Sequence, residues 1–411
     1  MQEIGIEGYA TDSAGLGGKI RTSAKDFEVR EVIDGNILNS IKKEYSQQRF
    51  AIFTLEKTNI DSIHAAKIAS RLFGANVRIL GLKDSRACTL QYLAVRAVRN
   101  MQLSLSRGNI TLNLLGYTDE NFSPRALLGN RFRIWVRGTN SDAGQAKKSL
   151  ESLKASFEAR KISNFYGLQR FGATRPITHL VGRALVNGSF EDAVRILVAE
   201  ESPNDSDEVA EAREAFTHRK LKEALQSFPE SYDIEKALIK SLIEKPSNYV
   251  AALRKLYLRV RRLFLAAYSS YIFNKVLSRT IYAGESFVPK EGDVVANLLP
   301  DYRLSAPSMY AMNKQSMIPM VPTVGYGYYP KNGRFNNIMQ EVMKDEQVIS
   351  KMFYVKEMQE TSFRTGLRPA PLLGSNLTSQ LANSDIFMEF FLVKGSYATV
   401  LLREVMKSDL S

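Results

Sequence analysis

The chain has 411 residues, 44% of them hydrophobic, and a formal net charge of +13, so we expect two folded domains and a polyanionic partner such as nucleic acid. Its single cysteine, Cys88, excludes an intrachain disulfide and favours a reducing, cytoplasmic setting, and the N-terminal MQEIGIEGYA lacks the pattern of a signal peptide. Three histidines without zinc-ligand spacing argue against a metal site and a histidine-dependent hydrolase, and no apolar run approaches the ~20 residues that span a membrane.

The first part of the chain alternates between strand and helix patterns. Strands are expected at residues 27–32, 50–55, 89–95, 110–115 and 130–137. Helices are expected over residues 62–72, with Asp61 or Ser62 as the N-cap, and over residues 142–160. This pattern predicts an α+β domain with a mixed or antiparallel sheet and helices on one face.

The middle of the chain has a different pattern. Residues 189–278 are predicted to be almost entirely helical, with Ser189 and Asp192 as a capping box, and the apolar residues between 253 and 271 fall on one helical stripe. Loops with short strands follow over residues 282–333. The end of the chain returns to a strand at 386–392 and a helix at 398–407. This return suggests that both ends form one domain around an insertion.

The sharpest candidate for chemistry is Asp84, in the segment GLKDSRACTLQ that leads into a predicted strand. The neighbouring cations Lys83 and Arg86 favour its ionised form, and an ionised, partly desolvated carboxylate can act as a nucleophile or a base. The alternative is a solvated turn, since glycine, lysine, aspartate and serine are ordinary turn residues.

Two further segments suggest contact with RNA. The segment NFYGLQRFG contains Arg170 among aromatic residues, which suits stacking on bases and binding of phosphates, although buried aromatics at a domain junction would give the same pattern. Residues 249–279 carry seven cations, including Arg254, Arg259 and Arg262, and no carboxylate. A helix face with one sign of charge is a candidate for binding a polyanion.

Five segments in order along the chain share motifs with one protein family. The segments at 81–91 and 164–172 are long and specific, and shorter motifs lie at 18–31, 129–132 and 394–404. Together they resemble the TruD family of pseudouridine synthases, and the segment THLVG indicates its archaeal and eukaryotic branch. The sequence departs from the family's motifs in having serine after Asp84, a lysine in the sequence AKDF, and a tyrosine in KGSYAT.

The resemblance implies an α+β catalytic domain built from residues 1–163 and 369–411, interrupted by a largely helical α+β insertion domain at 164–368. It implies that Asp84 is the catalytic residue. It also implies a set of substrate-binding residues, namely Arg21, Phe27, Lys83, Asn130, Phe132 and Tyr397.

The implied reaction breaks the N1–C1′ bond of a uridine and rejoins the ribose to C5 of the same uracil, without metal or cofactor. The implied substrate is tRNA, with position 13 in the D arm as the target, and no protein partner is implied. The target base must leave its stack, and Phe27, Phe132 and Asn130 would contact it. Asp84 would attack C1′ or remove the 2′ proton, and Arg21 is expected to orient it through a charge-assisted pair.

Two other functions remain open from the sequence. A non-catalytic tRNA-binding protein or RNA chaperone would use the same basic surfaces. A cofactor-free hydrolase would need a second carboxylate beside Asp84, and the sequence offers none whose placement can be argued.

Overall fold

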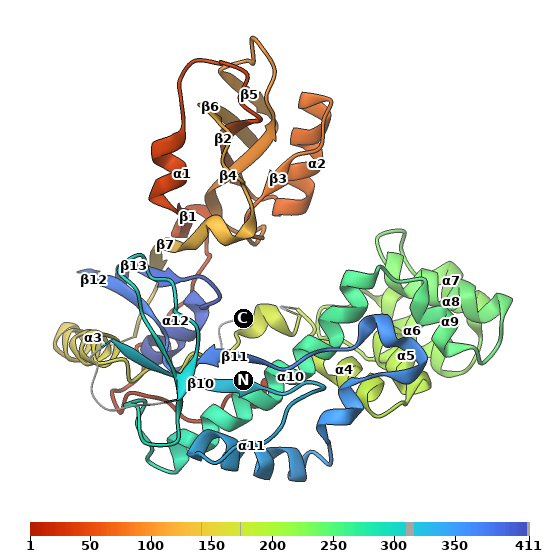
Figure 1. The fold of residues 1–411 in the computed structure, drawn as a ribbon. Helices are drawn as coiled ribbons and strands as arrows, with labels where there is room; N and C mark the ends of the chain where they lie inside the picture. The colour runs from red at the N-terminus through yellow and green to blue at the C-terminus, as the bar shows by residue number, and fades with distance from the viewer. Residues whose placement is uncertain (141, 173, 310–315, 409–411) are drawn as a thin grey trace.

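The computed structural model describes residues 1–140, 142–172, 174–309 and 316–408. Within these residues the main sheet has nine strands in the order β12-β13-β7-β1-β4-β2-β6-β5, with β3 paired to β4. These strands are β1 Phe27–Ile33, β2 Phe50–Thr58, β3 Arg78–Ile79, β4 Cys88–Arg96, β5 Ser104–Arg107, β6 Ile110–Thr118, β7 Leu127–Val136, β12 Gly374–Ala382 and β13 Asp385–Val393. The five strands expected before residue 140 are therefore all present, as Figure 1 shows.

The two ends of the chain share this sheet. Strand β13 pairs antiparallel with β7, and Phe390 lies opposite Phe132. Strand β1 pairs antiparallel with β7 but parallel with β4, so the sheet is mixed, as predicted. The chain thus forms one sheet from residues on both sides of the helical middle, whereas the boundaries at 163/164 and 368/369 stay a prediction.

Helices cover the sheet mainly on one face. The apolar residues Val29 and Phe132 face helices α3 (Ala143–Glu158) and α12 (Ala398–Met406), and the neighbouring strands β2 and β4 pack on α2 (Ser62–Phe73). The short helix α1 (Gly35–Ser40) is an exception, since its Ile37 packs with Ile52 from the opposite face of β2. Asp61 caps α2 by accepting hydrogen bonds from the backbone of the first turn, as one of the two predicted caps.

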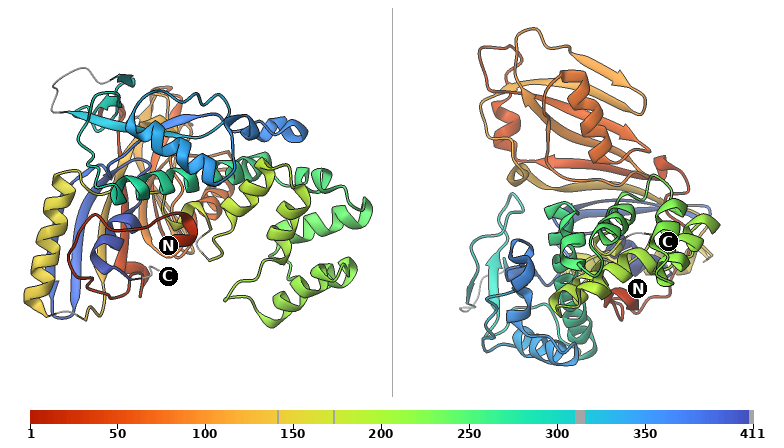
Figure 2. Two further views of the ribbon diagram at one scale, coloured as in Figure 1. Left: turned by 90° about the horizontal axis from the view of Figure 1, so that it is seen from below. Right: turned by 90° about the vertical axis from the view of Figure 1, so that its right-hand side faces the viewer.

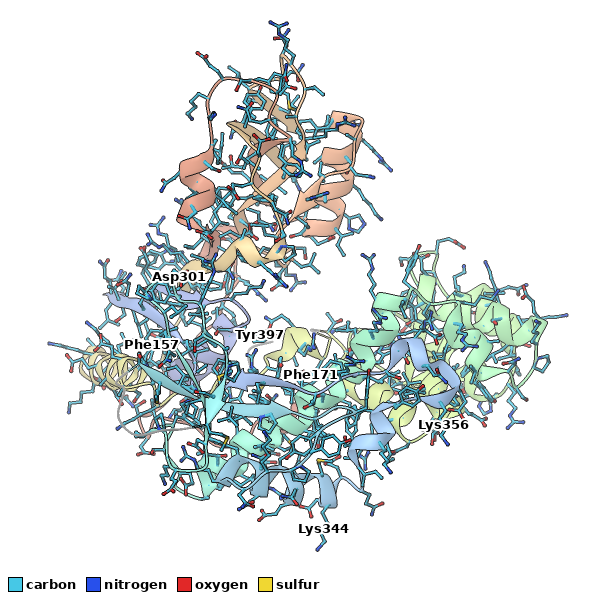
Figure 3. The ribbon with its side chains drawn as sticks, in the orientation of Figure 1. Phe157, Phe171, Asp301, Lys344, Lys356 and Tyr397 are labelled. Carbon is cyan, nitrogen blue, oxygen red and sulfur yellow. The ribbon has the colours of Figure 1, made fainter. Side chains whose placement is uncertain are left out.

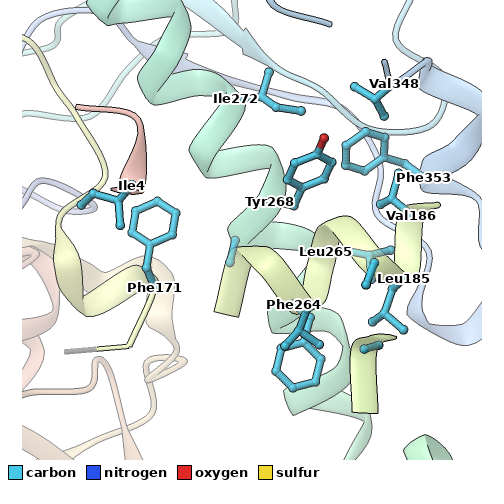
Figure 4. Packing of buried hydrophobic residues seen from close by; sticks show 14 of the residues in the cluster. Ile4, Phe171, Leu185, Val186, Phe264, Leu265, Tyr268, Ile272, Val348 and Phe353 are labelled. Carbon is cyan, nitrogen blue, oxygen red and sulfur yellow. The ribbon is translucent and has the colours of Figure 1, made fainter. Parts of the chain in front are cut away.

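The middle of the chain builds a second, mostly helical core. Its helices are α4 Thr178–Val186, α5 Phe190–Ala199, α6 Asp207–Thr217, α7 Leu221–Ser227, α8 Asp233–Glu244, α9 Tyr249–Arg254, α10 Leu258–Tyr282 and α11 Arg334–Asp345. Figure 1 and Figure 2 show α5–α9 standing away from the main sheet, with the long helix α10 leading back towards it. Figure 4 shows the packing around α10, where Tyr268 and Phe353 lie side by side with ring centroids 6.0 Å apart.

A smaller sheet and the N-terminus complete this part of the molecule. The smaller sheet has the order β11-β10-β8-β9, with β8 Val294–Asn297, β9 Ser308–Met309, β10 Met317–Thr323 and β11 Gly366–Pro369, so the expected short strands are present. Ile4 and Ile6 are buried in the helical core, and the side-chain amide of Asn274 on α10 donates to the Ile4 carbonyl at 2.9 Å. Across the described residues, no helix combines the length and apolar character that a bilayer crossing requires.

Two details of the helical middle were predicted wrongly. The Ser189 side chain makes no capping hydrogen bond at the start of α5. The apolar stripe at 253–271 is divided between α9 and α10, and Tyr257 in the connection is 76% exposed. Leu256 reaches the core from this connecting turn, so the apolar spacing continues although the helix does not.

Candidate active site

The segments that carry the five motifs meet at one pocket of about 180 Å³. The pocket lies where β1, β7, the loop before β4, the 164–172 segment and the turn before α12 come together. Its lining residues are Arg21, Phe27, Val29, Leu82, Lys83, Asp84, Ala87, Asn130, Phe132, Gln169, Ser396, Tyr397, Ala398 and Thr399. All seven catalytic and substrate-binding residues expected from the sequence are therefore among the residues that line it.

Asp84 and Arg21 form an ion pair at this pocket. The Arg21 guanidinium donates to the Asp84 carboxylate with an N–O distance of 2.7 Å, and the two side chains are 20% and 47% exposed. The same guanidinium lies 4.4 Å from the centre of the Phe27 ring, which holds it between a carboxylate and an aromatic face. Arg21 has a φ of 60°, in the left-handed region that costs free energy for residues other than glycine, so the surrounding structure must hold it there.

The backbone of the loop before β4 is fixed by buried polar side chains. The Ser62 hydroxyl accepts from the Lys83 backbone N–H at 2.8 Å and donates to the Gln91 side chain at 2.8 Å. The Gln91 amide in turn donates to the Gly81 carbonyl at 2.8 Å. These contacts fix the residues on one side of Asp84 to helix α2 and strand β4.

Lys83 is held in a buried ion pair. Its ammonium lies 2.7 Å from the Glu31 carboxylate, and the two side chains are 8% and 0% exposed. The other Glu31 oxygen accepts from the Tyr92 backbone N–H at 2.9 Å. The ammonium of Lys83 is thus bound by the Glu31 carboxylate. Arg21, and not Lys83, is the cation that contacts Asp84.

Lys57 lies buried directly beneath the loop. Its ammonium donates to the carbonyls of Ile60 at 2.7 Å and of Asp84 at 3.0 Å. Burial lowers the pKa of Lys57 to about 8, although the carboxylates of Asp61 and Asp84 act in the opposite direction. A buried lysine that clamps the backbone of Asp84 is a positioning group for that residue.

Aromatic rings and an amide form the floor of the pocket. Phe27 and Phe132 are 4% and 6% exposed and meet edge to face with centroids 6.2 Å apart, while Phe390 stacks on Phe132 at 5.3 Å. The Oδ1 atom of Asn130 is buried and has no hydrogen-bond partner among the described residues. A buried acceptor without a partner is costly, so this atom is suited to receive a donor from a bound base.

The pocket lining also contains Tyr397, which packs against residues of the helical middle. Its ring lies 6.2 Å from that of Tyr166, and the Arg368 guanidinium stacks 4.1 Å from the Tyr166 ring centre. Burial raises the pKa of Tyr397, so the phenol stays neutral at physiological pH. Arg170 lies beside this group, with its guanidinium over Tyr166 and its Nε donating to Ser270 at 3.1 Å. Figure 3 labels Tyr397 near the centre of the molecule.

Arg368 connects the start and the end of the helical middle. Its guanidinium donates to both the backbone and the side-chain oxygens of Asn164, at 3.1 and 2.9 Å, and to the Gly395 carbonyl at 2.8 Å. Close by, the Asn164 N–H donates to the Ala370 carbonyl at 2.8 Å. The turn that carries Tyr397 is therefore held to both segments that connect the main sheet with the helical middle, one at Asn164 and the other at Arg368.

The cationic helix face does not have one sign of charge in the folded molecule. Glu360, from the 3₁₀ helix η6 (Lys356–Thr361), forms ion pairs with Arg254 at 3.1 Å and with the buried Arg261. Although burial opposes ionisation, hydrogen bonds from its own backbone and from the two arginines lower the pKa of Glu360 to about 2. On α10, Lys275 pairs with Glu346 at 2.9 Å and Arg279 pairs with Asp345.

The prediction of an unneutralised face is therefore wrong, because acids distant in sequence fold onto it. Arg262 uses its Nε to bind the Glu360 carbonyl at 2.9 Å, and Arg259 lies over the exposed ring of Tyr257. Arg259 and Arg262 remain exposed, and neither forms an ion pair with a described residue. Of the three arginines proposed there for RNA contact, Arg254 alone is paired to a carboxylate.

Three residues at the site were not singled out from the sequence. Lys57 falls in phase with the buried residues Phe53 and Leu55 of β2, which is a detectable signal for a buried charge. Gln169 lines the pocket and accepts a hydrogen bond from Thr399 at 3.3 Å, and it lay within a recognised motif. Arg368 gave no signal, since its partners are more than 25 residues away in the chain.

Comparisons with known proteins show the family of this chain. The family model for tRNA pseudouridine synthase D (TruD) matches residues 3–405. A protein of Methanosarcina acetivorans described as a probable tRNA pseudouridine synthase D is 30% identical over 99% of this chain and 97% of its own length. One of Methanopyrus kandleri with the same description is 33% identical over 87% and 86%. The crystal structure of TruD from Methanosarcina mazei has a TM-score of 0.81 at 29% identity, covering 100% of this chain and 98% of that one. The chain therefore belongs to the TruD family of tRNA pseudouridine synthases, isomerases that act on tRNA.

Proposed function

We propose that this enzyme converts a uridine in the D arm of tRNA, at position 13, to pseudouridine, with the Asp84 carboxylate as its catalytic group. The observation that carries the proposal is the Arg21–Asp84 ion pair at a pocket floored by Phe27 and Phe132. The carboxylate is 47% exposed at this pocket, so it is reachable by a substrate that enters from solvent. Arg21 orients it through the charge-assisted hydrogen bond.

The chemistry requires an extruded base beside an ionised carboxylate. In one route, Asp84 attacks C1′ of the ribose and the N1–C1′ bond breaks with its electron pair going to the uracil. In the other, Asp84 removes the 2′ proton as the same bond breaks, which leaves a glycal. In both routes the detached uracil turns so that C5 bonds to C1′. In the first route the Asp84–C1′ bond breaks as C5 attacks, which frees the carboxylate, and in the second route Asp84 returns its proton to C2′ as C5 adds to C1′ of the glycal. The C5 proton is then lost to solvent and N1 takes up a proton.

The pocket walls support this sequence of steps. Phe27 and Phe132 offer apolar surface against which a detached uracil can turn without forming strong hydrogen bonds. The unpartnered Asn130 Oδ1 is placed to accept the N3–H of the base. The neutral Tyr397 forms a further part of the pocket lining. We assign Lys83 to fixing the loop through Glu31, rather than to direct contact with the base.

The RNA outside the pocket would be contacted by cations that form no ion pair among the described residues, of which Arg170 is half-buried and the others are exposed. Arg170 lies next to the pocket wall, and Arg259 and Arg262 lie on α10. Arg254 contributes less in this proposal, because its charge is offset by Glu360. No protein partner is needed for these steps.

The decisive test is the substitution Asp84→Asn. This change keeps the shape of the side chain and a hydrogen-bond acceptor for Arg21, so fold and tRNA affinity should be retained. Tritium release from 5-labelled uridine in a tRNA transcript should fall by at least about 10³-fold, as expected for loss of the reacting group. Turnover near the parental rate would remove Asp84 from the mechanism, and a parental enzyme without tritium release would favour a non-catalytic tRNA-binding protein.

The target position has a separate test. A transcript in which uridine 13 alone is replaced by cytidine should bind the enzyme but yield no pseudouridine when modified nucleosides are mapped. Undiminished product from that transcript would show that another uridine is the target, without affecting the role of Asp84.

A further inference from the structure

A second pocket, of about 560 Å³, lies at the far end of strand β4. Three exposed arginines, Arg49, Arg78 and Arg96, line it together with the aromatic residues Tyr45 and Phe50. Its remaining lining residues are Gln47, Gln48, Asn76, Ala94, Val95 and Ala97, so no carboxylate is among the described residues that line it. We propose that this arginine pocket binds the sugar–phosphate backbone of the tRNA substrate, away from the target uridine.

Strand register brings the three arginines together. Phe50 at the start of β2 lies opposite Arg96 at the end of β4, and Arg78 on β3 lies opposite Ala94. Ala94 and Arg96 point to the same face of β4 because side chains alternate along a strand. Arg49 immediately precedes β2, so the pocket forms at one corner of the sheet from three neighbouring strands.

These arginines keep their charge available, in contrast to Arg254 and Arg261, which are paired to Glu360. None of the three forms an ion pair with another residue in the described part of the chain. The nearest acid contact is between the Asp119 carboxylate and the backbone N–H of Arg49, at 2.9 Å, which leaves the guanidinium unbound. The guanidinium group of arginine can bind two phosphate oxygens through two parallel hydrogen bonds, so a phosphodiester is the ligand that suits this pocket.

The aromatic residues fit the same ligand. The guanidinium groups of Arg78 and Arg49 lie 5.1 and 5.5 Å from the centre of the Phe50 ring, which orders them without using their outward N–H groups. Tyr45 packs edge to face on Tyr117 at 5.3 Å and stays half-buried beside the arginines. Rings interleaved with cations are the combination that binds single-stranded or looped RNA.

The position of the pocket makes it distinct from the active site. The catalytic loop runs into β4 at Cys88, and Arg96 ends the strand eight residues later. At about 3.3 Å per residue the two ends are about 26 Å apart, which is less than one turn of a nucleic-acid duplex, about 34 Å. This inference rests on the proposed function in taking tRNA as the ligand.

The test compares tRNA binding by three matched triple variants. Arg49→Ala/Arg78→Ala/Arg96→Ala should raise the Kd for a tRNA transcript about tenfold or more at ~0.15 M salt, and should lower the slope of log K against log salt by about 2. Arg49→Lys/Arg78→Lys/Arg96→Lys keeps the charge and should retain most of the slope. Lys147→Ala/Lys148→Ala/Lys154→Ala removes the same charge from α3 and should leave Kd and slope near the parental values.

Turnover separates this proposal from that for Asp84. The alanine triple should raise KM and leave kcat near the parental value when tRNA is saturating, whereas Asp84→Asn should lose kcat. If the alanine triple does not fold, the single variant Arg96→Ala, on an exposed strand end, gives the same comparison with a smaller shift. An unchanged Kd and salt slope in a folded variant would overturn the proposal. Saturable binding of inorganic phosphate or adenosine monophosphate to the pocket, with unchanged tRNA affinity, would also overturn it, because the site would then serve a free anion.

Discussion

The loop before β4 that carries Asp84 and the cationic face of α9 and α10 looked alike in sequence, since both combine cations with a candidate role in RNA chemistry. In the folded enzyme both receive an opposite charge from a distant part of the chain, and they differ in its sign: a cation reaches the loop and an acid reaches the helices. At the loop, Asp84 takes its cation from Arg21, 63 residues away, while its neighbour Lys83 turns to Glu31. On the helices, Glu360 comes from about 100 residues away and binds Arg254 and Arg261.

The difference teaches that a run of like charges along the chain does not fix the charge of the surface it forms. Arg86 stands two residues from Asp84 without contacting it, whereas the distant Arg21 does. The three unpaired cations of the arginine pocket come from β3, from β4 and from the residue before β2, and they form no run in the sequence. Three substitutions test this contrast between neighbours in sequence and partners in space.

The largest effect is expected at Arg21. Arg21→Met removes the group that orients Asp84, and kcat should fall about 10²-fold, since a small displacement of a reacting group can cost that much. The affinity for tRNA should change little. Single-turnover tritium release at saturating tRNA measures the chemical step directly.

Two companion variants sharpen this result. Arg21→Lys keeps a cation and should recover part of the lost rate, and Arg86→Met should leave the chemical step near the parental rate despite its closeness in sequence. Equal losses for Arg86→Met and Arg21→Met would mean that local charge, rather than the observed ion pair, governs Asp84.

An intermediate effect is expected at Lys57. Lys57→Met removes the hydrogen bonds to the carbonyls of Ile60 and Asp84, and kcat should fall about tenfold, corresponding to roughly 1.4 kcal/mol, while KM stays constant. Lys67→Met on the exposed side of α2 is the matched control and should behave like the parent. A parental kcat for Lys57→Met would show that the loop does not need this clamp.

Lys57 also predicts a dependence of stability on pH. Its folded pKa of about 8 lies below the ordinary value of 10.5, so the unfolded chain holds the proton more tightly. Burial of this charge therefore opposes folding in full below pH 8, and its effect is relieved as the pH rises from 8 to 10.5. The Tm of the parent minus that of Lys57→Met should increase over this window, and a difference independent of pH would contradict the assignment.

The smallest effect is expected at Glu360. Glu360→Gln removes the carboxylate that offsets Arg254 and Arg261, so tRNA affinity should rise about twofold to threefold at low salt. Glu357→Gln makes the same change in net charge three residues earlier, on the same 3₁₀ helix. Identical gains for the two variants would show that total charge, and not the pairing, sets the affinity.

Local patterns predicted most of the fold. Alternating residues such as Phe132 and Ile134 identified β7, and Asp61 marked the start of α2. The break between α9 and α10 was missed because Leu256 continues the apolar spacing from a turn. Periodicity reports which residues are buried, and a turn that buries its side chain leaves no gap in the pattern.

The lining of the active site was predicted better than its electrostatics. Asp84, Asn130 and Tyr397 lie in motifs and do line one pocket. The partner of Lys83 could not be predicted, because an ion pair between a strand and a loop depends on the sheet order rather than on local sequence. The same limit applies to Glu360, whose pairing needs the whole helical core to be in place.

The contact between Asn164 and Ala370 has a consequence for the architecture of the enzyme. The chain leaves the main sheet and returns to it at the same point, where Ser163 and Pro371 also form a β-bridge. In the topology of the main sheet, the segment between Ser163 and Pro371 is therefore one very long connecting loop. Closing a loop costs only about 0.6 kcal/mol more for each doubling of its length. The helical middle can therefore be inserted at this point while the strands of the main sheet keep their pairing.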